Sequence, residues 1–282
     1  MKDSSEVRVN APALWRSHLP RPQPSDHKYS RGHALIAGGY PITGAARLAA
    51  RAAARVGTGL VTVAVPEIAF PIYAAALTSI MVHPLASPTE MNALLAGARL
   101  SACLIGPGAG VSEHTRSHAL AMLTTGKPTV LDADALTVFQ DDPSALDRAI
   151  VGACVLTPHD GEFGRILDTG GDRITRAQAA AKRCGAIIVL KGNATVIVAP
   201  DGRVLINRNA PPTLATAGSG DVLSGIVLGL LAQGMDPFLA AAAAVWMHGA
   251  AATAFGSGLM AEDLPELLPE VLQRLYGAPQ PQ

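Results

Sequence analysis

Short runs of apolar residues recur along the chain, and each ends at glycine or at polar residues. Most of these runs are apolar at every position rather than at alternate positions, which is typical of strands buried on both faces of a parallel sheet. Helical stretches separate the runs, so their order predicts βαβ crossovers with helices on both faces of the sheet. The seven expected strands are residues 33–37, 60–65, 79–82, 102–105, 129–132, 153–156 and 187–190.

The pattern changes after the seventh of these strands. Residues 194–199 and 204–206 predict a hairpin, because the Asp201-Gly202 pair between them is typical of a tight turn. An antiparallel pair of this kind is common at one edge of a parallel sheet. Three long helices are expected to follow, at residues 219–233, 237–255 and 264–276.

The composition fits one large α/β domain. The chain has 282 residues, of which 49% are hydrophobic, and this is ample for a core. We expect the domain to span residues 27–276, after an N-terminal segment (1–26) and before a frayed tail (277–282). Basic and acidic residues are balanced at 22 each and aromatic residues make up only 4%, so a nucleic-acid partner is not expected.

The cysteines, the N-terminus and the longest apolar run indicate where in the cell the protein is expected. Cys103, Cys154 and Cys184 form no C-x-x-C pair, so we expect buried thiols, no zinc site and a reducing compartment. The N-terminus is polar, so no secretory signal is expected and a cytoplasmic location is favoured. The uncharged run at residues 238–255 is mostly alanine, which fits a buried helix better than a membrane span.

The candidate chemistry is organised around residues 215–221. Small residues form a turn there, Asp221 follows, and an apolar helix begins at once. A helix start presents unpaired N–H groups and the positive end of the helix dipole, and glycine lets a phosphate approach closely. We interpret Gly218, Ser219 and Gly220 as an anion hole beside Asp221, which would take a proton from an attacking hydroxyl. Taken locally, an ordinary turn with Asp221 as a helix cap is an equally good interpretation.

Polar or glycine-rich breaks also follow most of the predicted strands. Because ligands bind outside the carboxyl ends of strands in an open parallel sheet, these breaks are expected to line one crevice. Each has a plainer interpretation as well: the glycines as tight turns, the acids as helix caps and His159 as a capping or core histidine. Lys191 needs a partner at the end of a buried strand, and phosphate and carboxylate suit it equally. The breaks are Gly38-Gly39, residues 106–110, Asp132 with Asp134, residues 157–162 and residues 191–193.

Taken in order, these strings resemble the ADP- or ATP-dependent NAD(P)H-hydrate dehydratases. The resemblance covers nearly the whole chain from His27 to about Phe255, and the similar stretches are residues 27–28, 34–39, 43–46, 57–63, 106–110, 130–136, 156–163, 190–195 and 215–221. It implies a ribokinase-like fold and a lyase that repairs damaged nicotinamide cofactor. The terminal phosphoryl group of ADP, or of ATP in eukaryotic members, would pass to the ring hydroxyl of hydrated NADH or NADPH. Phosphate would then be eliminated, which restores the cofactor and, with ADP, releases AMP.

The resemblance also implies roles for individual residues. Asp221 matches the acid that activates the ring hydroxyl, and Gly218, Ser219 and Gly220 match the anion hole. Two further sets match ligand contacts: Lys191, Gly192, Asn193, Ala194, Thr195 and Gly220 for AMP, and Ala45, Gly108, His159 and Asp221 for the hydrated dinucleotide. Mg²⁺ is expected with the phosphates, without a site built from protein ligands alone.

The family also suggests partners. Many bacterial relatives carry a fused hydrate epimerase domain, and this chain is too short for one, so we expect a separate NAD(P)H-hydrate epimerase as a functional partner. Family habit implies a homo-oligomer, with a tetramer as one form.

Three departures from the family pattern bear on the nucleotide. Tyr29 stands where glycine is usual, residues 208–213 are rich in proline, and Ala217 replaces the first of two glycines. The last of these brings the turn closer to small-molecule kinases of the same fold, so a hydroxymethylpyrimidine- or thiazole-type kinase is the alternative. The strings at 43–46 and 158–162 favour the dehydratase. A regulatory subunit that only binds nucleotide is a second alternative, and the intact Asp221 turn argues against it.

Overall fold

Ten strands form one sheet in the computed structural model, which describes residues 6–167 and 170–277. Their order across the sheet is β1-β10-β9-β8-β7-β6-β5-β2-β3-β4. Only β9 runs against its neighbours, because it pairs antiparallel with both β8 and β10 while the other pairs are parallel. The strands are β1 (Val7–Val9), β2 (His33–Ala37), β3 (Leu60–Pro66), β4 (Met81–Leu85), β5 (Ala102–Ile105), β6 (Thr129–Leu131), β7 (Cys154–Leu156), β8 (Ile187–Leu190), β9 (Thr195–Val198) and β10 (Val204–Asn207).

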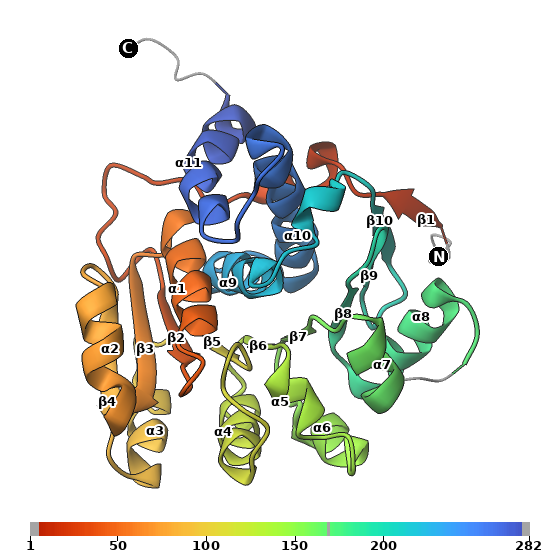
Figure 1. The fold of residues 1–282 in the computed structure, drawn as a ribbon. Coiled ribbons are helices and arrows are strands. Elements are labelled where there is room, and N and C mark those ends of the chain that lie inside the picture. The colour runs from red at the N-terminus through yellow and green to blue at the C-terminus, as the bar shows by residue number, and fades with distance from the viewer. Residues whose placement is uncertain (1–5, 168–169, 278–282) are drawn as a thin grey trace.

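Helices cover both faces of this sheet (Figure 1). The helices α1, α2, α9, α10 and α11 pack on one face, and α3 to α8 pack on the other. The α-helices are α1 (Gly44–Arg55), α2 (Phe70–Ala76), α3 (Pro88–Leu95), α4 (Glu113–Thr124), α5 (Asp134–Thr137), α6 (Pro143–Ala149), α7 (Asp160–Ile166), α8 (Arg173–Cys184), α9 (Ser219–Ala232), α10 (Pro237–Phe255) and α11 (Asp263–Tyr276). Short 3-10 turns are η1 (Pro12–Leu14), η2 (Arg16–His18), η3 (Glu67–Ala69) and η4 (Pro212–Leu214).

Alternate residues of each central strand enter different cores. In β2, Ala34 and Ile36 pack on one face, whereas Leu35 and Ala37 pack on the other. A strand covered on both faces has no position where a polar side chain would reach water. This double burial is the reason for the continuous apolar runs. The strand order and pairing confirm the predicted mostly parallel sheet with an antiparallel segment near one edge.

The edge beyond that segment holds a strand that the sequence pattern did not indicate. β1 pairs in parallel with β10, through Val7 opposite Val204 and Val9 opposite Ile206. Its three residues are exposed, so no apolar run marks it. The predicted strand at 79–82 also begins later, as β4. Of the tail predicted at 277–282, only Gly277 lies within the described residues.

The segment after β1 is anchored in the core by a tryptophan. Trp15 is completely buried, and its Nε1–H donates a hydrogen bond of 3.0 Å to Asn10 Oδ1. The amide of Asn10 in turn donates to the Ala242 carbonyl of α10 at 2.7 Å and to Asn207 Oδ1 at 3.0 Å. The N-terminal segment and α10 are therefore joined by a fully buried polar network.

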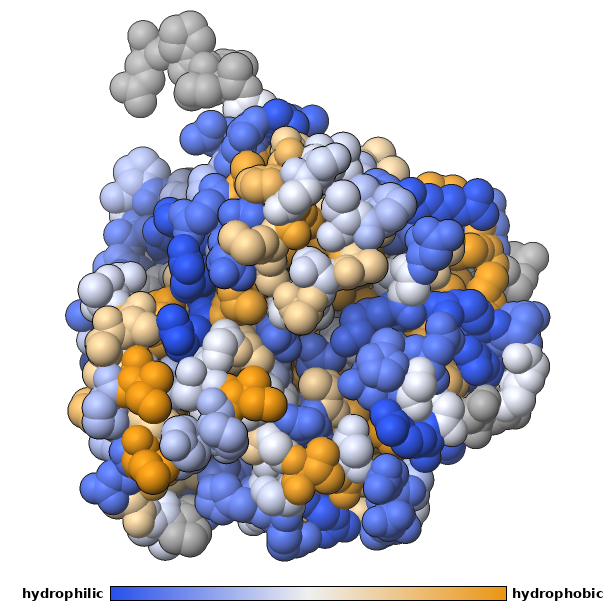
Figure 2. All heavy atoms as spheres, viewed as in Figure 1, coloured by the Kyte–Doolittle hydropathy of each residue, from blue (hydrophilic) through white to orange (hydrophobic). Residues whose placement is uncertain are grey.

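Helix α10 is the one described helix that is long and apolar enough to cross a membrane by length and composition alone. Within its apolar window 67% is buried inside the fold, and its alanines belong to the main core. It packs as a core helix, as its composition predicted. On the face seen in Figure 2, apolar side chains lie mostly in small groups among polar ones.

The strand order reverses between β2 and β5, which are neighbours although β3 and β4 lie between them in the chain. In open α/β sheets this reversal marks the place where ligands bind, outside the carboxyl ends of the strands. The two loops that leave β2 and β5 touch here, because a Cβ on Gly39 would lie only 1.8 Å from the Gly108 carbonyl oxygen. The topology therefore points to this end of the sheet as the site.

Candidate active site

The turn before α9 has a shape that only glycine fits. Gly218 precedes the helix with a φ of +88°, a left-handed conformation that other residues rarely adopt. A Cβ on Gly218 would also lie 2.7 Å from Leu48 Cδ1 and 2.9 Å from Ala261 Cβ. The helix therefore starts at Ser219, and its first N–H groups lack partners inside the helix, as an anion hole requires.

Asp221 stands in the first turn of α9 with a strongly shifted carboxyl group. Burial raises the pKa of Asp221 to about 7, and the charges of Asp132 and Asp134 act in the same direction, against the opposing effect of Lys191. The helix has Gly218 at its cap position and no side-chain cap, so the interpretation of Asp221 as a capping residue does not hold. A carboxylate with a pKa near 7 is well suited to act as a base at neutral pH.

Lys191 provides the positive charge beside this carboxyl group. Its Nζ donates a hydrogen bond of 2.8 Å to Oδ1 of Asp132, a side chain that is 1% exposed. Burial alone would lower the pKa of Lys191, but Asp132, Glu162 and Asp221 together raise the pKa above its usual value. Nζ also lies 3.3 Å from the position that a Cβ on Gly220 would take. The partner of Lys191 is thus a carboxylate, and its ammonium group still faces the anion hole.

The other predicted acid ties two loops together. Asp134 is the first residue of α5, and its Oδ2 accepts a hydrogen bond of 2.8 Å from the Gly110 backbone N–H. The cap position of α5 belongs to Ala133 and has no side-chain cap. Asp134 therefore fixes the glycine-rich loop after β5 against the loop after β6, instead of capping a helix.

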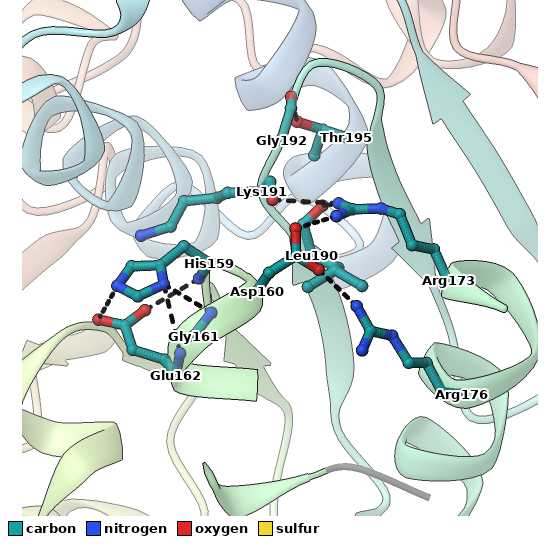
Figure 3. Close-up of polar contacts among 10 residues, drawn as sticks. All are labelled: His159, Asp160, Gly161, Glu162, Arg173, Arg176, Leu190, Lys191, Gly192 and Thr195. Carbon is teal, nitrogen blue, oxygen red and sulfur yellow. Dashed lines mark hydrogen bonds and ion pairs between the residues drawn. The ribbon is translucent and has the colours of Figure 1, made fainter. Parts of the chain in front are cut away.

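His159 is the cap residue of α7 (Figure 3). Its Nδ1 accepts hydrogen bonds from the backbone N–H groups of Gly161 at 3.0 Å and Glu162 at 3.3 Å. The Glu162 carboxylate accepts the His159 backbone N–H at 2.9 Å, which completes a capping box. Because Nδ1 accepts, the neutral ring carries its proton on Nε2, which lies 3.4 Å from Glu162 Oε1.

A pocket of about 650 Å³ opens beside these groups. It brings together seven of the residues predicted from the sequence, from the loops after β7 and β8 and from the start of α9. These seven are His159, Lys191, Gly192, Asn193, Thr195, Ser219 and Gly220. A pocket that combines a lysine, a glycine-rich turn and a helix N-terminus is suited to bind a phosphate-containing ligand.

The remaining predicted residues lie outside the lining of this pocket. Ala45 and Gly108 meet at the junction of β2 and β5, where a Cβ on Gly108 would lie 3.3 Å from Ala45 Cβ. Gly218 lies in the turn before α9 and Asp221 in the first turn of that helix, and Ala194 lies within the segment of residues 191–195. The site therefore has two parts, the pocket and the strand junction. The ligand that each part binds stays a prediction.

An apolar wall of the pocket was missed by sequence reasoning. It is formed by Leu214, Leu223 and Val245 together with the prolines Pro211 and Pro212. Leu223 and Val245 look like ordinary core positions of the two predicted helices, so no signal in the sequence separates them from the core. The proline pair was noted only as a departure from the family pattern.

His248 of α10 also lines the pocket and was likewise missed. Burial lowers the pKa of His248 to about 4, so the ring is neutral at physiological pH. Its Nε2 is buried without a hydrogen-bond partner among the described residues. Only its place within an apolar helix could have singled it out.

Comparison with known proteins finds the same family by sequence and by structure. The sequence model of the NAD(P)H-hydrate dehydratase family matches residues 33–274. The chain is 39% identical over 290 residues to the bifunctional NAD(P)H-hydrate repair enzyme of Salinibacter ruber, which covers 96% of this chain and 54% of that protein. It thus spans about half the length of the bifunctional relatives that it matches.

Two further relatives are similar to this chain over most of their own length. The ADP-dependent (S)-NAD(P)H-hydrate dehydratase of Neisseria meningitidis is 37% identical over 257 residues, covering 85% of this chain and 83% of that one. The crystal structure of the ADP/ATP-dependent NAD(P)H-hydrate dehydratase from Bacillus subtilis, co-crystallised with ATP and Mg²⁺, is 32% identical. It superposes with a TM-score of 0.83 and covers 95% of this chain and 99% of its own.

Proposed function

Since this chain belongs to the NAD(P)H-hydrate dehydratase family, which has a ribokinase-like fold, we propose that it repairs hydrated NADH and NADPH in a nucleotide-dependent reaction. The observation that carries the proposal is Asp221, a carboxyl group with a pKa of about 7 in the first turn of α9. It stands beside Lys191 at the edge of a pocket suited to a nucleotide.

In the proposed reaction Asp221 acts as the base, and Lys191 and the anion hole stabilise charge. Asp221 takes the proton of the ring hydroxyl as that oxygen attacks the terminal phosphorus of ADP, and the bond from this phosphorus to the AMP oxygen breaks. The N–H groups of the anion hole and the Lys191 ammonium stabilise the charge on the phosphoryl oxygens during transfer. The lone pair of the ring nitrogen then expels phosphate, and loss of a proton from the neighbouring ring carbon restores the double bond.

We propose that the pocket holds the nucleotide and that the strand junction holds the hydrated ring. The segment of residues 191–195 faces the pocket, and the apolar wall of the pocket suits the planar base of a nucleotide. Ala45 and Gly108 would then contact the dinucleotide at the junction, and His159 would contact it from the lining of the pocket. Use of ADP rather than ATP is the finer proposal, supported by the likeness to an ADP-dependent dehydratase.

Mg²⁺ would enter with the nucleotide. Within residues 6–167 and 170–277, no group of three or more His, Cys, Asp and Glu side chains could hold a metal ion. Oδ1 of Asp132 is already bonded to Lys191. The donor set therefore fits a cation held mainly by phosphate oxygens and water, and such a cation would neutralise charge on the phosphates.

The epimerase partner is also part of the proposal. The matching relatives include bifunctional NAD(P)H-hydrate repair enzymes, of which this chain spans about half. We propose that a hydrate epimerase works alongside this protein and supplies the epimer that it dehydrates.

A direct assay tests the function. The protein is incubated with hydrated NADH or NADPH, Mg²⁺ and either ADP or ATP, and the absorbance of the reduced nicotinamide is followed. We expect recovery that depends on the nucleotide, with AMP as a product when ADP is supplied. No recovery with either nucleotide, together with phosphorylation of a hydroxymethylpyrimidine or thiazole alcohol, would identify a kinase instead.

A further inference from the structure

The first residue of α8 reaches across to the end of β8. The guanidinium of Arg173 donates hydrogen bonds of 3.1 Å to two consecutive backbone carbonyls, those of Leu190 and Lys191 (Figure 3). Leu190 is the last residue of β8, and Lys191 begins the segment that lines the pocket. Arg173 thus holds the backbone at the point where the regular strand gives way to the pocket segment.

The next residue of the segment is shaped to this guanidinium. A Cβ on Gly192 would lie 2.7 Å from Arg173 Nη2 and 3.2 Å from its Cζ. The guanidinium therefore packs directly on the Gly192 backbone. A planar group that donates to two carbonyls and packs on the following glycine defines one conformation of residues 190–192.

Arg173 is itself held from a second loop. Its Nη1 pairs with the Asp160 carboxylate, which also pairs with Arg176 one turn further along α8. Asp160 directly follows His159, and the loops are joined again by a hydrogen bond of 2.8 Å from the Lys191 backbone N–H to the Pro158 carbonyl. Since Asp160 is half-exposed, the ion pair contributes little by itself, and the hydrogen bonds to the two carbonyls are the specific part.

From this geometry we infer that Arg173 is a positioning residue for nucleotide binding. It acts through the backbone of residues 190–192 and does not line the pocket of the nucleotide itself. A segment that is already ordered before the ligand arrives loses less conformational entropy on binding. The inference rests on the proposed function in one respect, that the ligand of residues 191–195 is a nucleotide.

The test compares two arginines that share one acid. Arg173→Lys keeps a charge for Asp160 but cannot serve both carbonyls, and Arg176→Lys is the matched control because it alters the other partner of the same carboxylate. We expect Arg173→Lys to raise the KM for ADP and the calorimetric Kd for AMP about tenfold. Its kcat at saturating ADP should stay within about twofold of the wild-type value, since the groups that meet the phosphoryl are unchanged.

Chemical rescue separates positioning from general stability. For Arg173→Ala, ethylguanidinium in solution should restore part of the AMP affinity, whereas it should not change the affinity of the wild type or of Arg176→Ala. Unchanged AMP affinity in Arg173→Lys, an equal loss in Arg176→Lys, or a fall in kcat at unchanged KM would each overturn the inference. If the wild type binds neither AMP nor ADP, the nucleotide part of the proposed function fails, and the inference fails with it.

Discussion

At the scale of single residues, the Asp221 carboxyl group is the feature with the largest chemical consequence. Its pKa is raised to about 7 by burial and by Asp132 and Asp134, which act against Lys191. A carboxyl group so placed is partly protonated at neutral pH, and it accepts a proton far more readily than an ordinary exposed aspartate. Two predictions follow from this group.

The first concerns its removal. Asp221→Asn keeps the size of the side chain but removes the base, so turnover of hydrated NADH should fall by about 10²–10⁴-fold. AMP affinity measured by calorimetry should change by less than about threefold, because the anion hole and Lys191 remain. Turnover that survives this substitution would show that another group acts as the base.

The second concerns pH. The active form is the ionised carboxylate, so a pKa raised to about 7 means that activity is lost as the pH falls below about 7, rather than near pH 4. Substrate phosphates titrate in a similar range, so the direct measurement is ¹³C NMR of labelled aspartate in the protein without ligands. One resonance should titrate near pH 7 and should be missing from Asp221→Asn. If every aspartate titrates below about pH 5, the proposed electrostatics are wrong.

At the scale of elements, the contact of α9 with α1 decides where the anion hole lies. A Cβ on Gly225, in the middle of α9, would lie 2.2 Å from the backbone carbonyl oxygen of Ala49 in α1. The two backbones are therefore in direct contact, with no space for a side chain. This contact sets the position of the whole helix, and with it the position of Gly218 and Asp221.

Gly225→Ala should separate the two helices, because the neighbouring atom is backbone and cannot turn away. We expect a loss of about 1–3 kcal/mol in the free energy of unfolding, measured by urea denaturation, together with reduced turnover. Gly164→Ala in α7 is the control, since open space surrounds that position and alanine favours the helix by up to about 1 kcal/mol. Equal effects of the two substitutions would contradict the close contact.

At the scale of the whole molecule, the N-terminal segment is a part of the core. It adds β1 to the sheet edge and buries Trp15 beside α10, the helix that also carries His248 into the pocket. The side chain of Asn10 links Trp15 to the Ala242 carbonyl. The far end of the sheet is thus tied to one wall of the active site through α10.

Trp15→Ala should destabilise the protein by about 3–5 kcal/mol, because it leaves a cavity where a completely buried indole had packed. Trp15→Phe fills most of that space but leaves Asn10 Oδ1 without its donor, so a smaller loss of about 1–3 kcal/mol is expected. Thermal unfolding of both variants measures the difference. A Trp15→Ala variant as stable as the wild type would show that the segment is not part of the cooperative core.

The sequence by itself determined the elements and the identity of the central groups. Strands buried on both faces must be apolar throughout, so β2, β5 and β8 could be located from uninterrupted apolar runs in the sequence. The turn at Gly218 could also be found from the sequence, because a left-handed residue before a helix requires glycine. Asp221 follows three residues later, in the first turn of the helix. The interpretation of His159 as a cap likewise depended only on neighbours three residues away.

Only the tertiary structure decided what depends on residues far apart in the chain. Lys191 had two equally suitable partners until the fold placed Asp132, 59 positions earlier, at 2.8 Å from its Nζ. The pKa of Asp221 and the apolar wall with Val245 likewise arise from groups that the chain brings together only on folding. Local patterns report periodicity and turn geometry, whereas charge coupling and pocket walls depend on distances across the sheet. The turn at residues 215–221 could therefore be recognised from the sequence, but the raised pKa of the Asp221 carboxyl group could not.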